Sequence, residues 1–282
     1  MEDPFTLAEM SGYERSVLGM RAAPELAEFI KTEYLDEDVE AAAERFPKGP
    51  EFRDILALLE SSGINKGARI LDLGGGRGLL SRALAEKGYR VTMLEINRSP
   101  ICGLGALTTR PLRFPAVCGH FNLLPIRGEV FDVVICKQVL HHAQSLLRCV
   151  SEISRVLKGN GLLIAYKEHC LPWYGGKKRF LRSHPGVRYG AQENAFRTAT
   201  YWLAFRRNGF KRVCLANIAS REELMEHYGR HRLKAKIVSL PLLGKWIFQI
   251  LYWKYYLWCF WCRHPGFPMT FLARKDLARK GP

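Results

Sequence analysis

The hydrophobic and polar positions of this chain alternate between helical and strand-like patterns over most of its length. Apolar residues recur at helical spacing in residues 51–64, and continuous apolar runs of strand length occupy residues 68–73, 90–96 and 131–136. Helix-like segments separate these runs, which predicts right-handed crossovers between parallel strands. We therefore expect an α/β protein with a doubly wound, mostly parallel sheet.

The alternation continues toward the C-terminus. The pattern predicts helices over residues 79–88, 145–161 and 199–209, and strands over residues 162–167, 210–218 and 268–275. Patterning and composition divide the chain into an N-terminal helical cap (1–50), a core (51–218), an insertion (219–267), and the last strand with its tail (268–282). The insertion is long for a connection between the last two strands of such a sheet, and long connections are usually functional.

A run of glycines follows the first predicted strand, in the stretch ARILDLGGGRG at residues 68–78. Glycine permits positive φ and lets a ligand approach the backbone, and ligands of open α/β sheets bind at the carboxyl ends of the strands. A dinucleotide fingerprint that starts at Gly74 would need Gly or Ala at position 79, which is Leu79. Arg77, within the run, is expected to be solvated.

The segment from Asp72 to Gly78 has the acidic-x-Gly-x-Gly-x-Gly pattern of class I S-adenosylmethionine-dependent methyltransferases, and the chain resembles that family from here to about residue 218. Glu95 ends the second strand 21 residues after Gly74, where a carboxylate can accept both ribose hydroxyls of a nucleoside. Residues 119–143, and the later stretch EISRVLKGNGLLIAY, resemble further family segments. The resemblance implies a seven-stranded Rossmann-like methyltransferase fold and S-adenosylmethionine as the cofactor.

The resemblance also implies roles for nine residues. The glycines turn around the methionine part of the cofactor, the first acidic residue receives its ammonium, and the second holds the ribose. Two apolar residues flank the adenine, and a lysine after the fourth strand contacts the methionine. A histidine stands where relatives commonly carry the Asp that accepts from the adenine amino group. The nine are Asp72, Gly74, Gly76, Gly78, Glu95, Ile96, His120, Phe121 and Lys137.

The candidate catalytic residues follow from the chemistry of methyl transfer, which mainly requires alignment of a nucleophile with the methyl group. A hydroxyl acceptor would also benefit from a general base. His141, His142 and Glu193 are the candidates, with Glu168 and His169 after the fifth strand as others. Residues 190–210, which contain Glu193, resemble a pattern of methyltransferases in glycan or lipid-glycan biosynthesis, although this segment could simply begin a helix.

The net charge of +16 is unevenly spread: residues 1–165 hold 20 Lys/Arg and 21 Asp/Glu, and residues 166–282 hold 23 and 6. Residues 246–262 add four of the six Trp. Aromatic bulk beside basic charge favours a segment at the surface of an anionic membrane, although a buried lid or a dimer-forming helix pair fits as well. Cys259 and Cys262 are expected to pack rather than bind metal, and no metal site is predicted.

We expect a protein without a secretory leader, because MEDPFTLAEM has no apolar segment after a positive one; it would be cytoplasmic or peripheral on the cytoplasmic face of a membrane. The leading hypothesis is a methyltransferase for a lipid-linked, glycan-like or hydrophobic small-molecule acceptor. An RNA methyltransferase remains a rival because of the basic C-terminal part. A nucleotide-binding interaction protein or an oxidoreductase on the same fold is the rival from another class.

Overall fold

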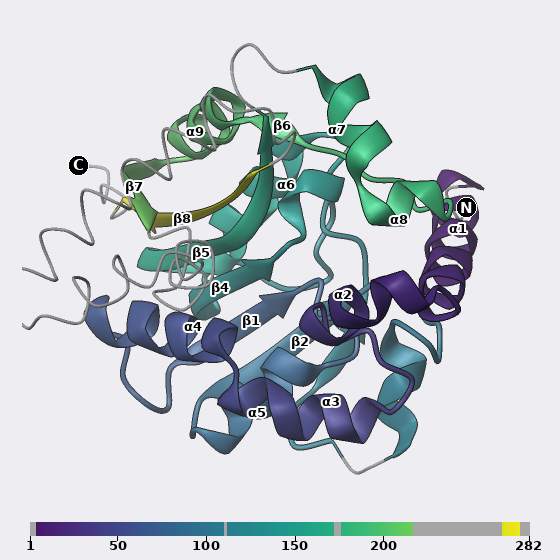
Figure 1. The fold of residues 1–282 in the computed structure, drawn as a ribbon. Coiled ribbons are helices and arrows are strands. Elements are labelled where there is room, and N and C mark those ends of the chain that lie inside the picture. Colours follow the sequence, from purple (N-terminus) through teal and green to yellow (C-terminus); the bar gives the residue numbers. More distant parts are fainter. Residues whose placement is uncertain (1–3, 110–111, 172–175, 217–266, 277–282) are drawn as a thin grey trace, which may run out of the picture.

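A β-sheet forms the centre of the protein in the computed structural model, which describes residues 4–109, 112–171, 176–216 and 267–276 (Figure 1). Seven strands lie side by side in the order β3-β2-β1-β4-β5-β8-β7, and a two-residue β6 pairs with the end of β5. The strands are β1 (Arg69–Leu73), β2 (Arg90–Glu95), β3 (Ala116–Cys118), β4 (Phe131–Lys137), β5 (Leu157–Leu171), β6 (Phe196–Arg197), β7 (Phe210–Ala216) and β8 (Phe267–Lys275).

The sheet is mostly parallel, as the sequence predicts. β1, β2, β3, β4 and β5 pair in parallel, whereas β8 runs antiparallel between β5 and β7. Strand order reverses between β1 and β4, since the chain first builds outward from β1 to β3 and then returns to the other side of β1. The carboxyl ends of β1 and β4 therefore flank a topological switch point, where ligands of such sheets bind.

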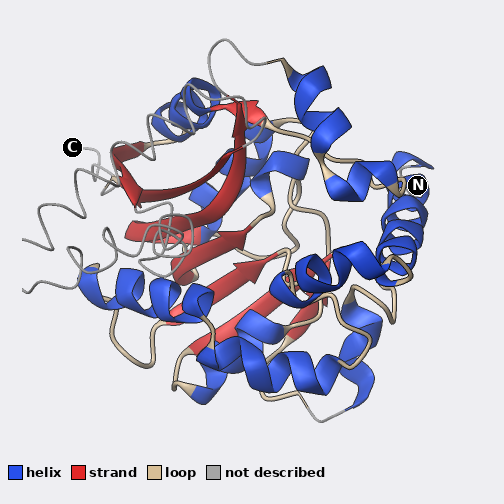
Figure 2. Cartoon of the chain, viewed as in Figure 1, coloured by secondary structure: helices blue, strands red, loops and turns tan. Residues whose placement is uncertain are grey.

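Helices cover both faces of the sheet (Figures 1 and 2). Side chains of α4 and α5 share one core cluster with the strands, and side chains of α6 and α9 share the other. The helices are α1 (Pro4–Arg21), α2 (Ala27–Thr32), α3 (Val39–Arg45), α4 (Pro50–Ser61), α5 (Leu79–Glu86), α6 (Leu146–Val156), α7 (Lys177–Ser183), α8 (Pro185–Arg188) and α9 (Thr198–Arg207).

The local sequence explains these helices. In α4, Pro50 occupies the first helical position, where its missing N–H costs nothing, and Phe52, Ile55 and Leu59 are fully buried on one face. In α6, the hydroxyl of Ser145 accepts from the N–H of Arg148 and caps the helix. The predicted helix over 145–161 is too long, because β5 begins at Leu157.

The N-terminal helices lie over the carboxyl edge of the sheet. α1 packs against α8, and the Ser16 hydroxyl donates to the carbonyl of Gly186 at 3.0 Å. Val17, Met20 and Ile30 form a small apolar cluster with Cys102, which follows β2. Residues of α1 and α2 thus lie together with α8 at the edge where the glycine run lies (Figure 1).

Several sequence predictions meet the structure at strand ends. Glu168 and His169, predicted to follow the fifth strand, lie within β5 because that strand continues to Leu171. The strands β3 and β6 were not predicted, because at three and two residues they are too short for a recognisable pattern. All but the last residue of the predicted insertion over 219–267 lies outside the described residues. Among the residues that the structure does describe, no helix has the length and apolar character needed to cross a bilayer.

Candidate active site at the carboxyl edge of the sheet

A cavity of about 560 Å³ opens at the carboxyl edge, above the switch point. Eleven of the twelve site residues expected from the sequence line it: Asp72, Gly74, Gly76, Glu95, Ile96, His120, Phe121, Lys137, His141, His142 and Glu193. Gly78 is the exception, because it caps α5 and faces Leu107 on the other side of the loop. The volume lies in the range of about 300–1,000 Å³ that is usual for small-molecule sites.

The glycine run turns from β1 into α5 through three residues with positive φ. Gly74, Gly76 and Gly78 have φ of +73°, +54° and +74°, a region that L side chains rarely adopt. A Cβ on Gly74 would lie 2.5 Å from a Val139 methyl carbon, so this glycine is needed for packing. A Cβ on Gly76 would meet only the Cys102 carbonyl, at 3.7 Å, so this part of the loop is open.

Glu95, at the end of β2, joins the glycine loop to the neighbouring strand. One carboxylate oxygen accepts the N–H of Gly76 at 2.8 Å, and the other accepts the N–H of Asn97 at the same distance. Burial raises the pKa of this carboxyl, and the backbone donors act against that rise. A carboxylate oxygen can accept more than one hydrogen bond, so Glu95 keeps acceptor capacity toward the cavity.

Asp72 lies beneath the same loop and is almost fully buried. Its carboxylate accepts the Ser81 hydroxyl at 2.6 Å, which ties the end of β1 to α5. Burial raises the pKa of Asp72 to about 6, although the Ser81 hydrogen bond favours the ionised form. A cation in the cavity would favour that ionised form further.

The residues predicted to surround the adenine, Ile96, His120 and Phe121, also line the cavity. The His120 and Phe121 rings are 4.5 Å apart between centroids. Nδ1 of His120 accepts the N–H of Asn122 at 3.0 Å. This contact fixes the tautomer with the proton on the other ring nitrogen, which makes that nitrogen a donor rather than the acceptor that the sequence predicts for the adenine amino group.

Lys137 ends β4 within a cluster of charges. Its Nζ lies 3.0 Å from a Glu51 carboxylate oxygen, and Lys167 lies 3.1 Å from the other oxygen. Burial alone would lower the pKa of Lys137, but the Glu51 and Glu33 carboxylates outweigh it and the net shift is upward. If Lys137 contacts the methionine part of a cofactor, as the sequence predicts, its ammonium contacts Glu51 at the same time.

Arg77 corrects the expectation of a solvated side chain. It is 6% exposed, and one guanidinium nitrogen donates to the carbonyls of Tyr34 and Asp36 at 2.9 and 2.7 Å. These two carbonyls belong to the segment between α2 and α3, so the side chain fastens the N-terminal cap to the glycine loop. The sequence gives little sign of this role, because the partners are main-chain atoms more than 40 residues away.

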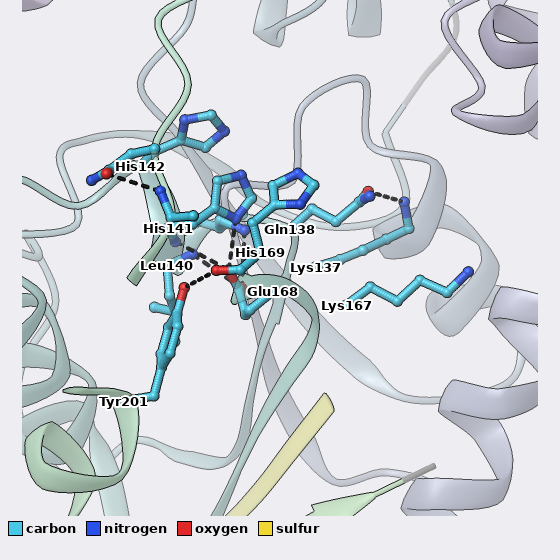
Figure 3. A network of polar contacts seen from close by, with 12 residues as sticks. Lys137, Gln138, Leu140, His141, His142, Lys167, Glu168, His169 and Tyr201 are labelled. Atoms are coloured by element: carbon cyan, nitrogen blue, oxygen red, sulfur yellow. Dashed lines mark hydrogen bonds and ion pairs between the residues drawn. The ribbon is translucent and has the colours of Figure 1, made fainter. Parts of the chain in front are cut away.

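A second group of polar residues lies at the cavity; we call it the histidine–carboxylate wall, formed by His141, Glu168, His169 and Glu193. Figure 3 shows His141, Glu168 and His169. Glu168 is its fully buried centre. The carboxylate accepts the N–H groups of Val139, Leu140 and His141 at 3.0–3.1 Å. It also lies 2.8 Å from Nδ1 of the His141 ring.

The contact with Glu168 defines the chemistry of His141. A carboxylate acceptor places the imidazole proton on Nδ1, and burial lowers the pKa of His141 so that the ring is neutral. Nε2 therefore carries the lone pair. This atom lies 3.6 Å from Oε2 of Glu193, on the cavity side of the wall.

Glu193 and His169 complete the wall. The Glu193 side chain is only 7% exposed, and burial raises its pKa to about 8. The His169 ring lies 4.4 Å from that of His141 between centroids, and its carbonyl accepts the Tyr201 hydroxyl (Figure 3). His142 is more exposed and lies 3.9 Å from Glu193.

Irregular backbone at the strand ends positions these side chains. Gln138 and Lys167 both have positive φ, at +57° and +53°, immediately after β4 and near the end of β5. The pairing of β5 with β8 shifts register between Ala165 and Glu168. Such a bulge changes the direction of the following side chains, so Glu168 and His169 both reach the wall from adjacent positions. Non-glycine residues with positive φ cluster at functional sites.

The residues present fit a nucleoside cofactor that carries a cation. The open loop at Gly76 lies beside Glu95, which has acceptor capacity, and the buried Asp72 can gain charge near a cation.

An ion-pair cluster of Lys137, Glu51 and Lys167 was not predicted from the sequence, because Glu51 lies on α4 and reaches β4 only in the folded protein.

Comparison with known proteins matches residues 71–165 to a methyltransferase domain family. A ubiquinone biosynthesis O-methyltransferase of Coxiella burnetii is 29% identical over 109 residues, which cover 38% of this chain and 47% of the relative. A sterol 24-C-methyltransferase of Gibberella zeae is 33% identical over 134 residues, or 44% of this chain and 35% of the relative. The chain thus spans half or less of the length of these curated relatives.

Among solved structures, a phosphoethanolamine N-methyltransferase of Haemonchus contortus, in complex with phosphomonomethylethanolamine and S-adenosylhomocysteine, has a TM-score of 0.56. It is 18% identical, and the match covers 83% of this chain and 56% of that one. At this identity the likeness concerns the fold. Residues 71–165 are thus identified as a methyltransferase domain, and the order of the strands agrees with the Rossmann-like methyltransferase fold that the sequence predicts.

Proposed function

We propose that this protein transfers the methyl group of S-adenosylmethionine to a hydroxyl oxygen of a hydrophobic or lipid-linked small molecule. One observation carries the proposal: a single cavity joins the glycine loop and Glu95 to a neutral imidazole whose free lone pair faces it. The curated relatives that resemble the chain are named for ubiquinone and sterol methylation, which supports an acceptor of low polarity.

When bound, the cofactor supplies an electrophilic methyl group on a sulfonium. In our proposal, Glu95 accepts hydrogen bonds from the ribose, the backbone at Gly76 allows close approach, and Asp72 balances the positive charge. These residues hold the methyl group in one direction and thereby supply the alignment that this reaction needs. The wall opposite them receives the acceptor.

Nε2 of His141 is the atom placed to take the proton of the acceptor hydroxyl. Glu168 accepts Nδ1–H, keeps the ring in the useful tautomer and favours the imidazolium that forms. A general base of this kind contributes roughly 10²–10⁴ to the rate.

The N-terminal helices favour an apolar acceptor. Met20, Phe29 and Leu35 line the cavity, together with Phe46 from the segment after α3. The basic and aromatic insertion over 219–267 supports our proposal that the acceptor is presented from an anionic lipid surface, as the sequence predicts.

The test is untargeted mass spectrometry of lipid and glycan extracts incubated with the protein and with S-adenosylmethionine labelled as CD₃. We expect a product that carries CD₃ in place of the hydroxyl hydrogen, and its loss in His141→Asn, with cofactor binding measured by calorimetry unchanged. A labelled RNA product, or no labelled product while the cofactor binds, would contradict the proposed acceptor. Absence of cofactor binding would contradict the methyltransferase activity itself.

A further inference from the structure

The histidine–carboxylate wall contains more ligand atoms than a proton transfer needs. His141, His169 and Glu193 each offer one donor atom, and these three atoms all lie within 4.8 Å of one another. They come from three separate parts of the chain, namely the turn after β4, the end of β5 and the segment before β6.

Two of these side chains have buried polar atoms without a partner among the described residues. Oε2 of Glu193 and Nδ1 of His169 are both inaccessible to solvent and make no hydrogen bond. The Glu193 side chain is more than nine-tenths buried and lines the cavity. Buried polar atoms without a partner are rare in folded proteins and call for an explanation such as an ion.

From these contacts we infer that His141, His169 and Glu193 bind a divalent cation of the zinc type, with one open coordination position toward the cavity. Two imidazoles and one carboxylate with a free fourth position make a donor set that zinc commonly uses where it takes part in chemistry. Zinc–nitrogen and zinc–oxygen bonds of about 2.0–2.2 Å place tetrahedral ligands roughly 3.3–3.6 Å apart. The separation of 3.6 Å between Nε2 of His141 and Oε2 of Glu193 already agrees with this geometry.

Glu168 supplies the support that metal-binding histidines usually have. It accepts Nδ1–H of His141 at 2.8 Å, which leaves Nε2 as the ligand atom and fixes the orientation of the ring. Its other hydrogen bonds come from three consecutive backbone N–H groups, so its position does not depend on the cation. The first ligand of the site is thus held in place before any ion arrives.

The site is distinct from the two-cysteine pattern at Cys259 and Cys262, which lies outside the described residues. Soft thiolates would hold zinc there without histidine or carboxylate. A binding experiment on the full chain must therefore distinguish zinc bound by the two cysteines from zinc bound at the histidine–carboxylate wall.

The role of the cation, unlike its binding, rests on the proposed function. The lone pair of His141 cannot hold a cation and accept a proton at the same time. In the cation-bound form the acceptor hydroxyl would occupy the open position, lose its proton to solvent water because the cation lowers its pKa, and form the new O–CH₃ bond as the S–CH₃ bond breaks.

The first experiment measures zinc binding by the full chain after treatment with a chelator, using equilibrium dialysis and elemental analysis. We expect one zinc ion per chain, and a loss of affinity of about 100-fold in His169→Asn and in Glu193→Gln. His184→Asn is the matched control, because His184 is close to His169 but is not one of the three ligands. We expect it to keep its zinc.

A second arm uses Co²⁺ as a spectroscopic probe and a Cys259→Ser/Cys262→Ser variant. We expect a visible spectrum without thiolate charge-transfer bands, and no change in the cysteine variant. Loss of zinc from the cysteine variant alone, equal binding by wild type and His169→Asn, or no binding at all would overturn the inference. Calorimetry with S-adenosylmethionine on the same samples tests the proposed function separately, because the cofactor residues are not among the ligands.

Discussion

The two sides of the cavity are built in different ways. The side to which we assign the cofactor, called the cofactor side, consists of the glycine loop and Glu95, which lie within the 22 consecutive residues 74–95 and make main-chain contacts. The histidine–carboxylate wall draws on three distant segments, and its contacts join side chains whose pKa values burial has shifted. The cofactor side is thus fixed by backbone conformation, whereas the wall is fixed by the folded sheet and can differ between proteins with the same fold.

The largest effect should come from filling the open loop. Gly76→Val places a branched side chain at φ +54° and directs it into the cavity, so we expect S-adenosylmethionine affinity to fall by at least about 100-fold. Gly63→Val is the matched control, since Gly63 also has positive φ, with no atom near its Cβ position, but does not line the cavity. Calorimetry should find cofactor binding lost only in the first variant; equal affinities would contradict the placement of the cofactor.

A smaller effect is expected from the wall. Glu168→Gln removes the charge that orients His141 and should lower kcat by about 10²–10³-fold, while cofactor affinity stays within a few-fold. Tyr201→Phe is a control on the same wall, because it removes a hydrogen bond to the His169 carbonyl without touching Glu168. Steady-state kinetics on folded samples tests this; equal kcat values for both variants would contradict an orienting role.

The affinity for the cofactor should change by about tenfold with pH. Burial raises the pKa of Asp72 to about 6, so its ionised form predominates only above that pH. If this carboxylate receives the cofactor ammonium, binding should tighten as the pH rises from 5 to 7, and Asp72→Asn should flatten the profile.

The raised pKa of Asp72 also makes the stability of the fold depend on pH. Because the folded pKa lies above the unfolded value, Asp72 stabilises the fold at low pH and this contribution is lost as the pH rises from about 4 to about 6. Asp132→Asn is the control, since Asp132 lies at the start of β4, away from the cavity, where Lys158 and a backbone N–H help to lower its pKa. If the dependence of folding stability on pH is flattened in the Asp132 variant rather than in the Asp72 variant, the assignment of this shift to Asp72 is contradicted.

The smallest effect concerns the fastening of the N-terminal cap. Arg77→Met removes the hydrogen bonds of one guanidinium nitrogen to the carbonyls of Tyr34 and Asp36, and we expect a loss of about 1–2 kcal/mol in the free energy of unfolding. Denaturant titration measures it. The unchanged stability of this variant would mean that the cap is held to the loop by its apolar contacts alone.

The sequence predicted the proximity of the glycine loop and Glu95 better than the contacts within the wall, for a physical reason. The strand, the glycines and Glu95 are close in sequence, so local pattern and spacing suffice to bring them together. Predictions placed His141 and Glu193 at the site but could not pair His141 with Glu168, because that pairing depends on the register shift in β5. Arg77 was misplaced for the same reason, since its main-chain partners leave no pattern in the sequence.

The fold was predictable because buried parallel strands have continuous apolar runs, which β1, β2 and β4 show clearly. β3 and β6 were missed because strands of three and two residues carry no periodicity. The boundary between α6 and β5 was misplaced, because α6 ends at Val156 and β5 begins at the next residue, with no glycine or proline at this junction to mark the end of the helix.

The most direct test of the account is calorimetry of S-adenosylmethionine with the wild-type protein and Glu95→Ala. Glu60→Ala, on the exposed face of α4, is the control. We predict micromolar-range binding by the wild type and the control, and at least a 30-fold weaker affinity for Glu95→Ala, because in our proposal the buried carboxylate accepts hydrogen bonds from the ribose. Equal affinity of all three proteins would show that the cofactor does not bind at this end of the cavity.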